Sequence, residues 1–159
     1  MSQLIVVGIS DMKVTKAPGV LITYALVSCI GICFYDQAAH LGALLHIMLP
    51  DAPMNIDNVF KYADSGIAET LKKMESMGGS RSRMTSKIAG GAQMFSVPGD
   101  SALGNIGKRN ADSVKMVLLK QRVRMLSADV GGTFARTVEF DTSTGIAKVR
   151  TYGHPDKEL

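Results

Sequence analysis

The sequence predicts an α/β fold, a layered sandwich of mostly antiparallel or mixed β-sheet with flanking helices. Short apolar runs bounded by glycine, proline, asparagine or aspartate outnumber the stretches with helical periodicity, so strands should outnumber helices. The chain has 159 residues, of which 46% are hydrophobic. This length and composition predict a single globular domain, residues 1–159, with a core of ordinary size.

The first part of the chain holds the longest apolar runs. Strands are expected over residues 4–9 and 20–26, the second after a turn at Pro18-Gly19. Residues 29–35 and 40–49 should form two antiparallel strands of a hairpin, because the four residues between them are a permitted loop length.

A helix is expected after an irregular loop at residues 50–58. Apolar side chains recur on one face of residues 62–77, while Lys72 and Lys73 lie on the other face. Gly78-Gly79 should end this helix.

The second part of the chain should combine another helix with short strands. This helix is expected over residues 111–122, with Asn110 as its N-cap. The other expected features are strands at residues 87–89, 124–128, 137–140 and 148–152, an apolar pair Met94-Phe95 before Pro98-Gly99, and turns at Gly131-Gly132 and residues 141–145.

The charge pattern argues against nucleic-acid binding. The formal net charge is +4 and the sequence pI is about 9.1, with basic residues dispersed among acidic ones. The densest basic groups have no interleaved aromatic residues on which bases could stack. These groups are Arg81, Arg83 and Lys87, and Lys108 with Arg109. They indicate a solvated face, with attraction to an acidic protein partner as the alternative.

A cytoplasmic protein without membrane insertion is expected. Two cysteines, no basic leader and no small-residue cleavage site argue against secretion. Residues 19–35 carry no charged side chain and reach the lower length limit of a membrane span. However, this run is rich in β-branched residues and breaks at Tyr35-Asp36, and the apolar run at residues 41–49 is too short to span. Two buried strands explain the pattern better.

No nucleotide cofactor is expected. Residues 99–104 have the outer glycine spacing of a phosphate loop, but Asn105 and Ile106 stand where lysine and serine or threonine are required. The glycines are better explained by turns and close packing.

Zinc is an alternative use of the cysteines and histidines. Cys29, Cys33, His40 and His46 supply two sulfurs and two nitrogens, but the six residues between Cys33 and His40 are fewer than finger-type sites use. In the expected hairpin these side chains would follow the two strands instead of converging. No metal is therefore expected.

The hairpin predicts a catalytic pair. If Tyr35 pairs with His40, Cys29 lies directly opposite His46, and opposite side chains have Cβ atoms about 4.5–5.5 Å apart. A thiol and an imidazole at that separation can share a proton. A slip of one residue would place them on opposite faces. Cys33 is expected to be a small core residue.

A cysteine beside a histidine predicts a thiol hydrolase. A free thiol is only about 3% ionised at pH 7, so an imidazole that takes its proton greatly increases the fraction of nucleophilic thiolate. His46 would then protonate the leaving amide nitrogen. The imidazole also needs a polar group to orient it, and residues 19–50 offer Thr23 on the preceding strand. Strand parity alone does not decide whether Thr23 faces His46.

Several segments spread over nearly the whole chain form a specific set. They read APGVLITYALVSCIGICFYD, LGALLHIMLPD, KYAD, KIAGGAQMF, NIGKRN and DVGGTFAR. Together they resemble the chemoreceptor glutamine deamidases of the CheD type. The resemblance implies a protein-glutamine glutaminase of chemotaxis, which converts selected glutamines of methyl-accepting receptors to glutamate, releases ammonia, and can also hydrolyse receptor glutamyl methyl esters.

The resemblance also carries structural and partner expectations. It assigns the catalytic roles to Cys29, His46 and Thr23, with backbone N–H groups near Ser28 and Cys29 expected to stabilise the oxyanion. It implies an α/β sandwich similar to the catalytic domain of the deamidating cytotoxic necrotizing toxins, and a CheC-type phosphatase as a partner. A monomer without cofactor is expected. A non-catalytic adaptor for the receptor or the phosphatase, and a cysteine peptidase, are the alternatives.

One departure from the family pattern lies beside the nucleophile. Family members usually have glycine immediately before the Ser-Cys pair and two residues earlier, where this chain has Val27 and Ala25. Glycine would supply a positive φ angle or room for a substrate backbone. Either the turn is ordinary in this chain, or the substrate approaches differently.

Overall fold

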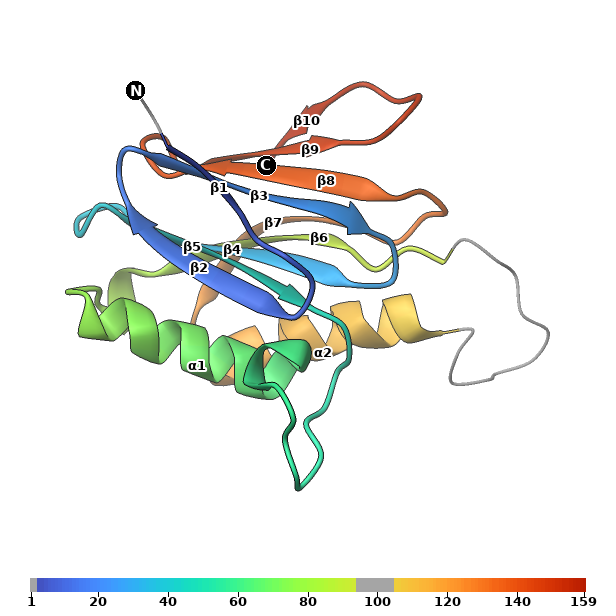
Figure 1. The fold of residues 1–159 in the computed structure, drawn as a ribbon, viewed down its shortest axis with the longest axis horizontal. Helices are drawn as coiled ribbons and strands as arrows, with labels where there is room; N and C mark the ends of the chain where they lie inside the picture. The colour runs from blue at the N-terminus through green and yellow to red at the C-terminus, as the bar shows by residue number, and fades with distance from the viewer. Residues whose placement is uncertain (1–2, 94–104) are drawn as a thin grey trace.

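Two stacked β-sheets, one of them covered by helices, make up the fold in a computed structural model that describes residues 3–93 and 105–159 (Figure 1). The strands are β1 (Gln3–Val6), β2 (Asp11–Lys16), β3 (Gly19–Leu26), β4 (Ile30–Asp36), β5 (Leu41–Ile47), β6 (Thr85–Gly90), β7 (Arg124–Val130), β8 (Arg136–Asp141), β9 (Ile146–Arg150) and β10 (Lys157–Glu158). The helices are α1 (Ala63–Ser76) and α2 (Ile106–Lys120), with 3-10 turns η1 (Val59–Lys61) and η2 (Arg81–Arg83).

Both sheets are mixed. Sheet A has the strand order β1-β3-β8-β9-β10, and sheet B has the order β2-β5-β4-β6-β7. The pairs β1–β3 and β6–β7 are parallel, and the other pairs are antiparallel. The expected α/β class is confirmed, with two mixed sheets and two α-helices among the described residues.

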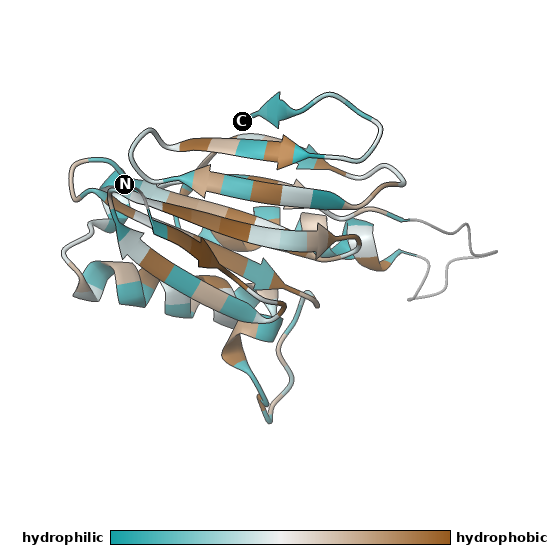
Figure 2. Ribbon diagram, turned by 45° about the horizontal axis from the view of Figure 1, so that its top comes forward, coloured by the Kyte–Doolittle hydropathy of each residue, from teal (hydrophilic) through white to brown (hydrophobic). Residues whose placement is uncertain are grey.

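The core has two layers because sheet B is buried on both faces. Leu44 of β5 belongs to the apolar cluster between the sheets, together with Leu21 and Phe140 of sheet A. Its neighbour Leu45 belongs to the cluster between sheet B and the helices, together with Ile67 of α1. Figure 2 shows apolar and polar residues alternating along several strands, and both kinds on the helices. A strand buried on both faces reads as a continuous apolar run, which explains the uncharged sequence of this region.

The membrane alternative is not supported. Residues 19–35 form β3, the turn after it and most of β4. Neither α1 nor α2, nor any other helix in the described ranges, has the length and apolarity that a membrane span needs.

The hairpin of β4 and β5 exists, but its predicted register is wrong. The closing pair is Asp36 with Leu41, not Tyr35 with His40, so the pairing moves by two positions along the ladder. His40 lies in the loop with a φ of 56°, a left-handed conformation that cannot continue a strand. The buried Asp36 carboxylate accepts hydrogen bonds from the Ala39 N–H and from Arg83, which stabilises the later closing position.

The second helix also begins earlier than predicted. Asn105 is its N-cap residue, and Asn110 lies inside α2 as a fully buried residue instead of capping it. Gly107 is needed in the first turn of α2 because a Cβ there would lie 2.6 Å from the Ala92 carbonyl oxygen. The start of α2 thus packs against the backbone that follows β6.

The remaining predictions are mostly confirmed. The first helix, the loop at residues 50–58, and the strands at residues 20–26, 87–89 and 124–128 are present. The first strand ends at Val6, the last hairpin strand ends at Arg150, and β2 and β10 were not predicted. The predictions for Met94-Phe95, Pro98-Gly99 and residues 99–104 lie outside the described residues.

Candidate active site

Thr23 and His46 meet in the interior of the sandwich. Thr23 is on β3 of sheet A, His46 is on β5 of sheet B, and both side chains are fully buried. Their contact is a hydrogen bond of 2.7 Å between Thr23 Oγ1 and His46 Nδ1. Two sheets that face each other therefore supply an imidazole and the hydroxyl that fixes its ring.

The hydrogen bonds of Thr23 determine the tautomer of His46. Thr23 Oγ1 also lies 2.7 Å from the carbonyl oxygen of Val7, which can only accept. The single hydroxyl proton of Thr23 is used in that bond, so Oγ1 must accept from the imidazole. Nδ1 of His46 is therefore protonated, and in the neutral ring Nε2 carries the lone pair. Within the described part of the chain, Nε2 has no hydrogen-bond partner.

Burial keeps both members of the candidate pair neutral. It lowers the pKa of His46 from 6.5 to about 4. It also raises the pKa of the Cys29 thiol, although the residue's own backbone N–H partly opposes the shift. At neutral pH the site thus holds a thiol and an uncharged imidazole, not a preformed ion pair.

Cys29 lies where the chain crosses between the sheets. Residues 27–29 connect β3 of sheet A to β4 of sheet B, and the Cys29 side chain is partly exposed. The Cys29 carbonyl accepts from the Gly91 N–H at 2.9 Å. Gly90 allows this approach, because a Cβ at that position would be 2.1 Å from the Cys29 carbonyl oxygen.

The predicted placement of Cys29 directly opposite His46 is wrong. Gly31 occupies that position, and Cys29 stands diagonally from His46, one residue before β4 begins. A Cβ on Gly31 would lie 3.1 Å from Leu26 and 3.6 Å from Thr23, so the missing side chain lets these two residues of β3 pack closely against β4 beside the Thr23–His46 contact. The register error is two residues, so the paired residues of β4 keep the faces that were predicted, and Cys29 packs against the apolar cluster between the sheets.

The end of β3 and the turn before Cys29 carry the departure from the family pattern. Ala25 has a φ of 59°, in the region that favours glycine, whereas Val27 has no positive φ. Ala25 lies between Thr23 and Leu26, where the pairing of β3 with β8 is irregular. Val27 and Ser28 use their carbonyls as acceptors, from the Ala92 N–H and Asn110, respectively. Among described residues, no acceptor is found for the Ser28 N–H.

Two residues of the site were not identified from the sequence. The Asn110 side chain donates to the carbonyls of Ser28 and Met48. Arg136, nearly buried, donates to the Gly90 carbonyl at 3.2 Å and to Asp129 at 3.0 Å, and so supports the backbone next to Cys29. Both residues lie in segments that carry the family resemblance, Asn110 in NIGKRN and Arg136 in DVGGTFAR. The spacing of these segments in the sequence did not indicate a role for either residue.

Cys33 is separate from the candidate site. It is buried in the cluster between the sheets, and burial raises its pKa to about 12. A thiol of this kind is inert at neutral pH. No group of three or more histidine, cysteine, aspartate or glutamate side chains in the described ranges is arranged to hold a metal ion.

The densest basic groups are partly used in ion pairs. Arg83 bonds the buried Asp36, Arg81 bonds Glu75, and Lys108 bonds Asp112. Arg83 therefore serves the hairpin loop, while exposed pairs of the Lys108 type contribute little to stability.

The fold and site define an α/β protein with a candidate thiol-hydrolase centre. Comparison with known proteins identifies the family: residues 48–151 match the family described as CheD chemotactic sensory transduction. Proteins of Syntrophomonas wolfei and Desulfitobacterium hafniense (strain DCB-2) are both 46% identical to it, over 99% and 100% of both chains, respectively. Both are named probable chemoreceptor glutamine deamidase CheD. The chain belongs to the CheD family.

A solved structure of a Neisseria meningitidis protein of the DUF152 family shares the fold. It superposes with a TM-score of 0.55 at 11% sequence identity, over 83% of this chain and 65% of that chain. The residues matched by the CheD family description begin after Thr23, Cys29 and His46. The roles of these three residues therefore rest on the geometry described above.

Proposed function

We propose that this protein is a protein-glutamine glutaminase that deamidates selected glutamine side chains of chemotaxis receptors. Family membership supports the reaction, since the relatives are named for it. The observation that carries the mechanism is the 2.7 Å bond from His46 Nδ1 to Thr23, which leaves Nε2 unprotonated and, among the described residues, without a partner. An imidazole held in this way is ready to act as a general base.

The proposed reaction begins with attack by Cys29. Its Sγ attacks the side-chain carbonyl carbon of a receptor glutamine while the thiol proton passes to His46 Nε2. The carbonyl oxygen becomes an oxyanion, which the N–H groups of Ser28 and Cys29 stabilise. The unpartnered Ser28 N–H within the described residues supports this role.

The second half of the reaction returns the proton. His46 protonates the amide nitrogen, which leaves as ammonia, and a thioester to Cys29 remains. A water molecule then transfers a proton to Nε2 and attacks the thioester carbonyl. The Cys29 sulfur leaves and regains a proton from His46, and the product is glutamate. A glutamyl methyl ester would follow the same steps with methanol as the leaving group.

The neutral pair has a mechanistic consequence. Since burial lowers the pKa of His46 and raises that of Cys29, thiolate forms only as the proton moves to Nε2 during attack. Sγ does not bond Nε2 in the free protein. Catalytic hydrogen bonds are often long in unliganded enzymes and tighten once substrate binds, so the free geometry is compatible with this mechanism.

The proposed setting is the cytoplasm, with residues 1–159 acting as one monomeric domain. A CheC-type phosphatase is proposed as a second partner, and the toxin catalytic domains as structural relatives.

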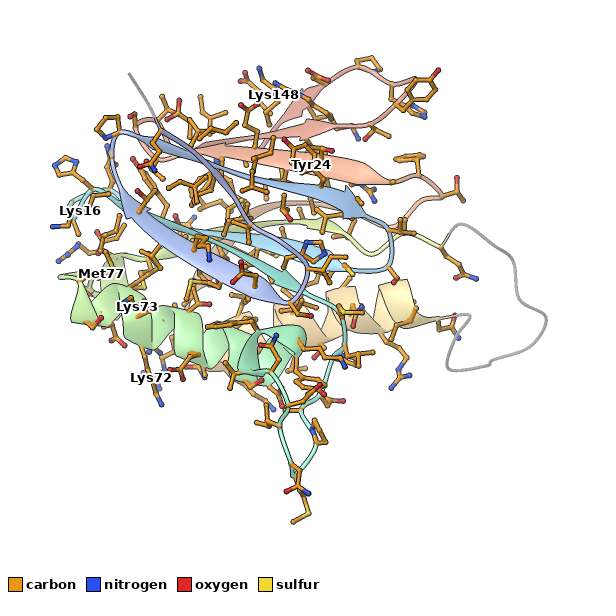
Figure 3. All side chains as sticks on the ribbon, viewed as in Figure 1. Lys16, Tyr24, Lys72, Lys73, Met77 and Lys148 are labelled. Carbon is orange, nitrogen blue, oxygen red and sulfur yellow. The ribbon has the colours of Figure 1, made fainter. Side chains whose placement is uncertain are left out.

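The net charge of +4 favours an acidic docking partner. Lys16, Lys72 and Lys73 lie toward the same end of the molecule (Figure 3). An association rate with receptor that is insensitive to salt would contradict electrostatic docking.

The reaction is tested by ammonia release and intact-mass spectrometry of a receptor fragment. Wild type and Cys33→Ala should both convert amide to acid without shortening the chain, whereas Cys29→Ala should release no ammonia. Full activity of Cys29→Ala would disprove the thiol mechanism. Shortened products would indicate a peptidase, and receptor binding without any change of mass would indicate an adaptor.

A further inference from the structure

Asn110 places an amide on the buried face of α2. The residue is fully buried, and its helical neighbours on that face are small or apolar, including Ala111 and Val114. An asparagine in a helix interior has lower helix propensity than the residues around it. Its position therefore calls for an explanation from its contacts.

The side chain bonds two backbone segments that are far apart in the sequence. Nδ2 donates to the Ser28 carbonyl at 2.9 Å and to the Met48 carbonyl at 2.8 Å. An amide nitrogen has two protons, and each is used in one bond. The opposite orientation would place Oδ1 against two carbonyl oxygens, so the contacts determine how the amide lies.

The two bonded segments carry the candidate nucleophile and base. Ser28 immediately precedes Cys29, and Met48 follows His46 by two residues at the end of β5. Among the described residues, Asn110 is the one side chain bonded to both segments. The Cys29 backbone is thus held from two sides, by Asn110 before the residue and by the Gly91 N–H at its own carbonyl.

Stability alone does not explain why a buried asparagine occupies this position, because Oδ1 of the same amide is unsatisfied within the described part of the chain. It is buried and has no hydrogen-bond partner in the described ranges. An unsatisfied buried acceptor opposes the stabilisation that the two Nδ2 bonds provide. The net gain in stability is therefore smaller than the two bonds suggest, while the geometric link remains.

We propose that Asn110 is a positioning residue that fixes the separation between Cys29 Sγ and His46 Nε2. The proposal rests on the proposed function, and it adds a third element, α2, to the two sheets that supply the reacting groups. Thr23 orients the imidazole ring, and Asn110 fixes the turn that carries the thiol relative to the strand that carries the ring.

The test compares Asn110→Ala and Asn110→Ser with Ser113→Ala. Ser113 lies one turn further along α2 and bonds the Pro50 carbonyl at 3.2 Å, so its removal costs a similar helix-to-backbone bond without touching the Ser28 turn. Asn110→Ser retains one hydroxyl donor, which can bond at most one of the two carbonyls. This second variant keeps the test valid if Asn110→Ala does not fold.

We expect both Asn110 variants to lower kcat about 10-fold to 100-fold, since displacements near 1 Å cost rates of this order. KM for the receptor fragment should change by less than about 3-fold, as a positioning role predicts. Ser113→Ala should retain kcat. All rates are compared at a temperature at which circular dichroism shows each variant folded.

Alkylation of Cys29 by iodoacetamide gives a second readout without receptor. In the wild type, His46 should assist alkylation near neutral pH. In the Asn110 variants the rate should follow a simple thiol titration at higher pH, as in His46→Asn. The proposal would be overturned if the Asn110 variants kept the wild-type alkylation profile and the wild-type kcat. It would also be overturned if Ser113→Ala lost as much kcat as the Asn110 variants. Absence of deamidation by the wild type would instead refute the proposed function, while the alkylation profiles would still decide the role of Asn110.

Discussion

The buried neutral His46 should make the stability of this protein fall in mild acid. Burial lowers the pKa of His46 from 6.5 to about 4 in the folded chain, whereas unfolding returns it to its ordinary value. Between these two values the unfolded chain binds a proton that the folded chain does not. The free energy of unfolding is therefore unaffected well above pH 6.5 and decreases as the pH falls toward 4. The shift corresponds to about 3 kcal/mol, a large part of the roughly 5–15 kcal/mol of a typical domain.

Urea unfolding at a series of pH values tests this expectation, with His46→Asn as the reference. The asparagine amide can donate to Thr23 in place of Nδ1, but it does not titrate. The wild type should lose about 3 kcal/mol more than the variant between neutral pH and about pH 4. Parallel pH dependences of the two proteins would show that His46 is not kept neutral by burial, and would refute the argument for a neutral pair.

The titration of Asp36 does not affect the comparison between wild type and His46→Asn. Burial acts to raise the pKa of its carboxyl, but hydrogen bonds from Arg83, Ser80 and Ala39 lower it below the ordinary value. A carboxylate with a lowered pKa contributes stability that is present above its unfolded pKa of about 3.8 and is lost as the pH falls through the folded value. This loss occurs below the histidine window, and it is common to both proteins.

Three further results are expected. Thr23→Val, which leaves Nδ1 without its acceptor, should lower kcat by roughly 10²–10⁴-fold, while Thr23→Ser should stay within about 10-fold of wild type, as steady-state ammonia release would show. Ala25→Gly should raise the free energy of unfolding in urea by about 0.5–1 kcal/mol, because relief of the left-handed strain exceeds the added chain entropy. Peptide mapping after brief iodoacetamide treatment should find Cys29 modified and the buried Cys33 unmodified; the reverse order would contradict the assignment.

The hairpin illustrates how far the sequence predicts this fold. Two apolar runs and a four-residue connection were enough to predict β4 and β5, because strands buried on both faces have a distinctive composition. The register depends on contacts that are distant in sequence, since Asp36 is bonded by Arg83 and by the Ser80 N–H. Local patterns contain no information on such contacts, and the predicted pairing was therefore displaced.

Thr23 and Asn110 show the same limit at the candidate site. Parity along β3 did not decide the direction of Thr23, because the pairing becomes irregular between Thr23 and Leu26 before the chain reaches Cys29. Asn110 was interpreted as an N-cap, a role that fits its chemistry at a helix end. The helix begins earlier because Gly107 packs closely on the Gly91 backbone, and this contact places the Asn110 amide in the interior.

The arrangement of the site across two sheets links its chemistry to the packing between them. Thr23 belongs to sheet A and His46 to sheet B, so the bond that fixes the tautomer spans the same interface as the apolar cluster of Leu44 and Phe140. Leu45, the neighbour of Leu44, packs instead against the helices. Changes of spacing between the sheets therefore act directly on Nε2 and on the turn that crosses at Cys29. The helix layer also contacts the site: Ile30 and Ile47, the chain neighbours of Cys29 and His46, pack in the cluster with the helices, and Asn110 of α2 bonds the turn before Cys29.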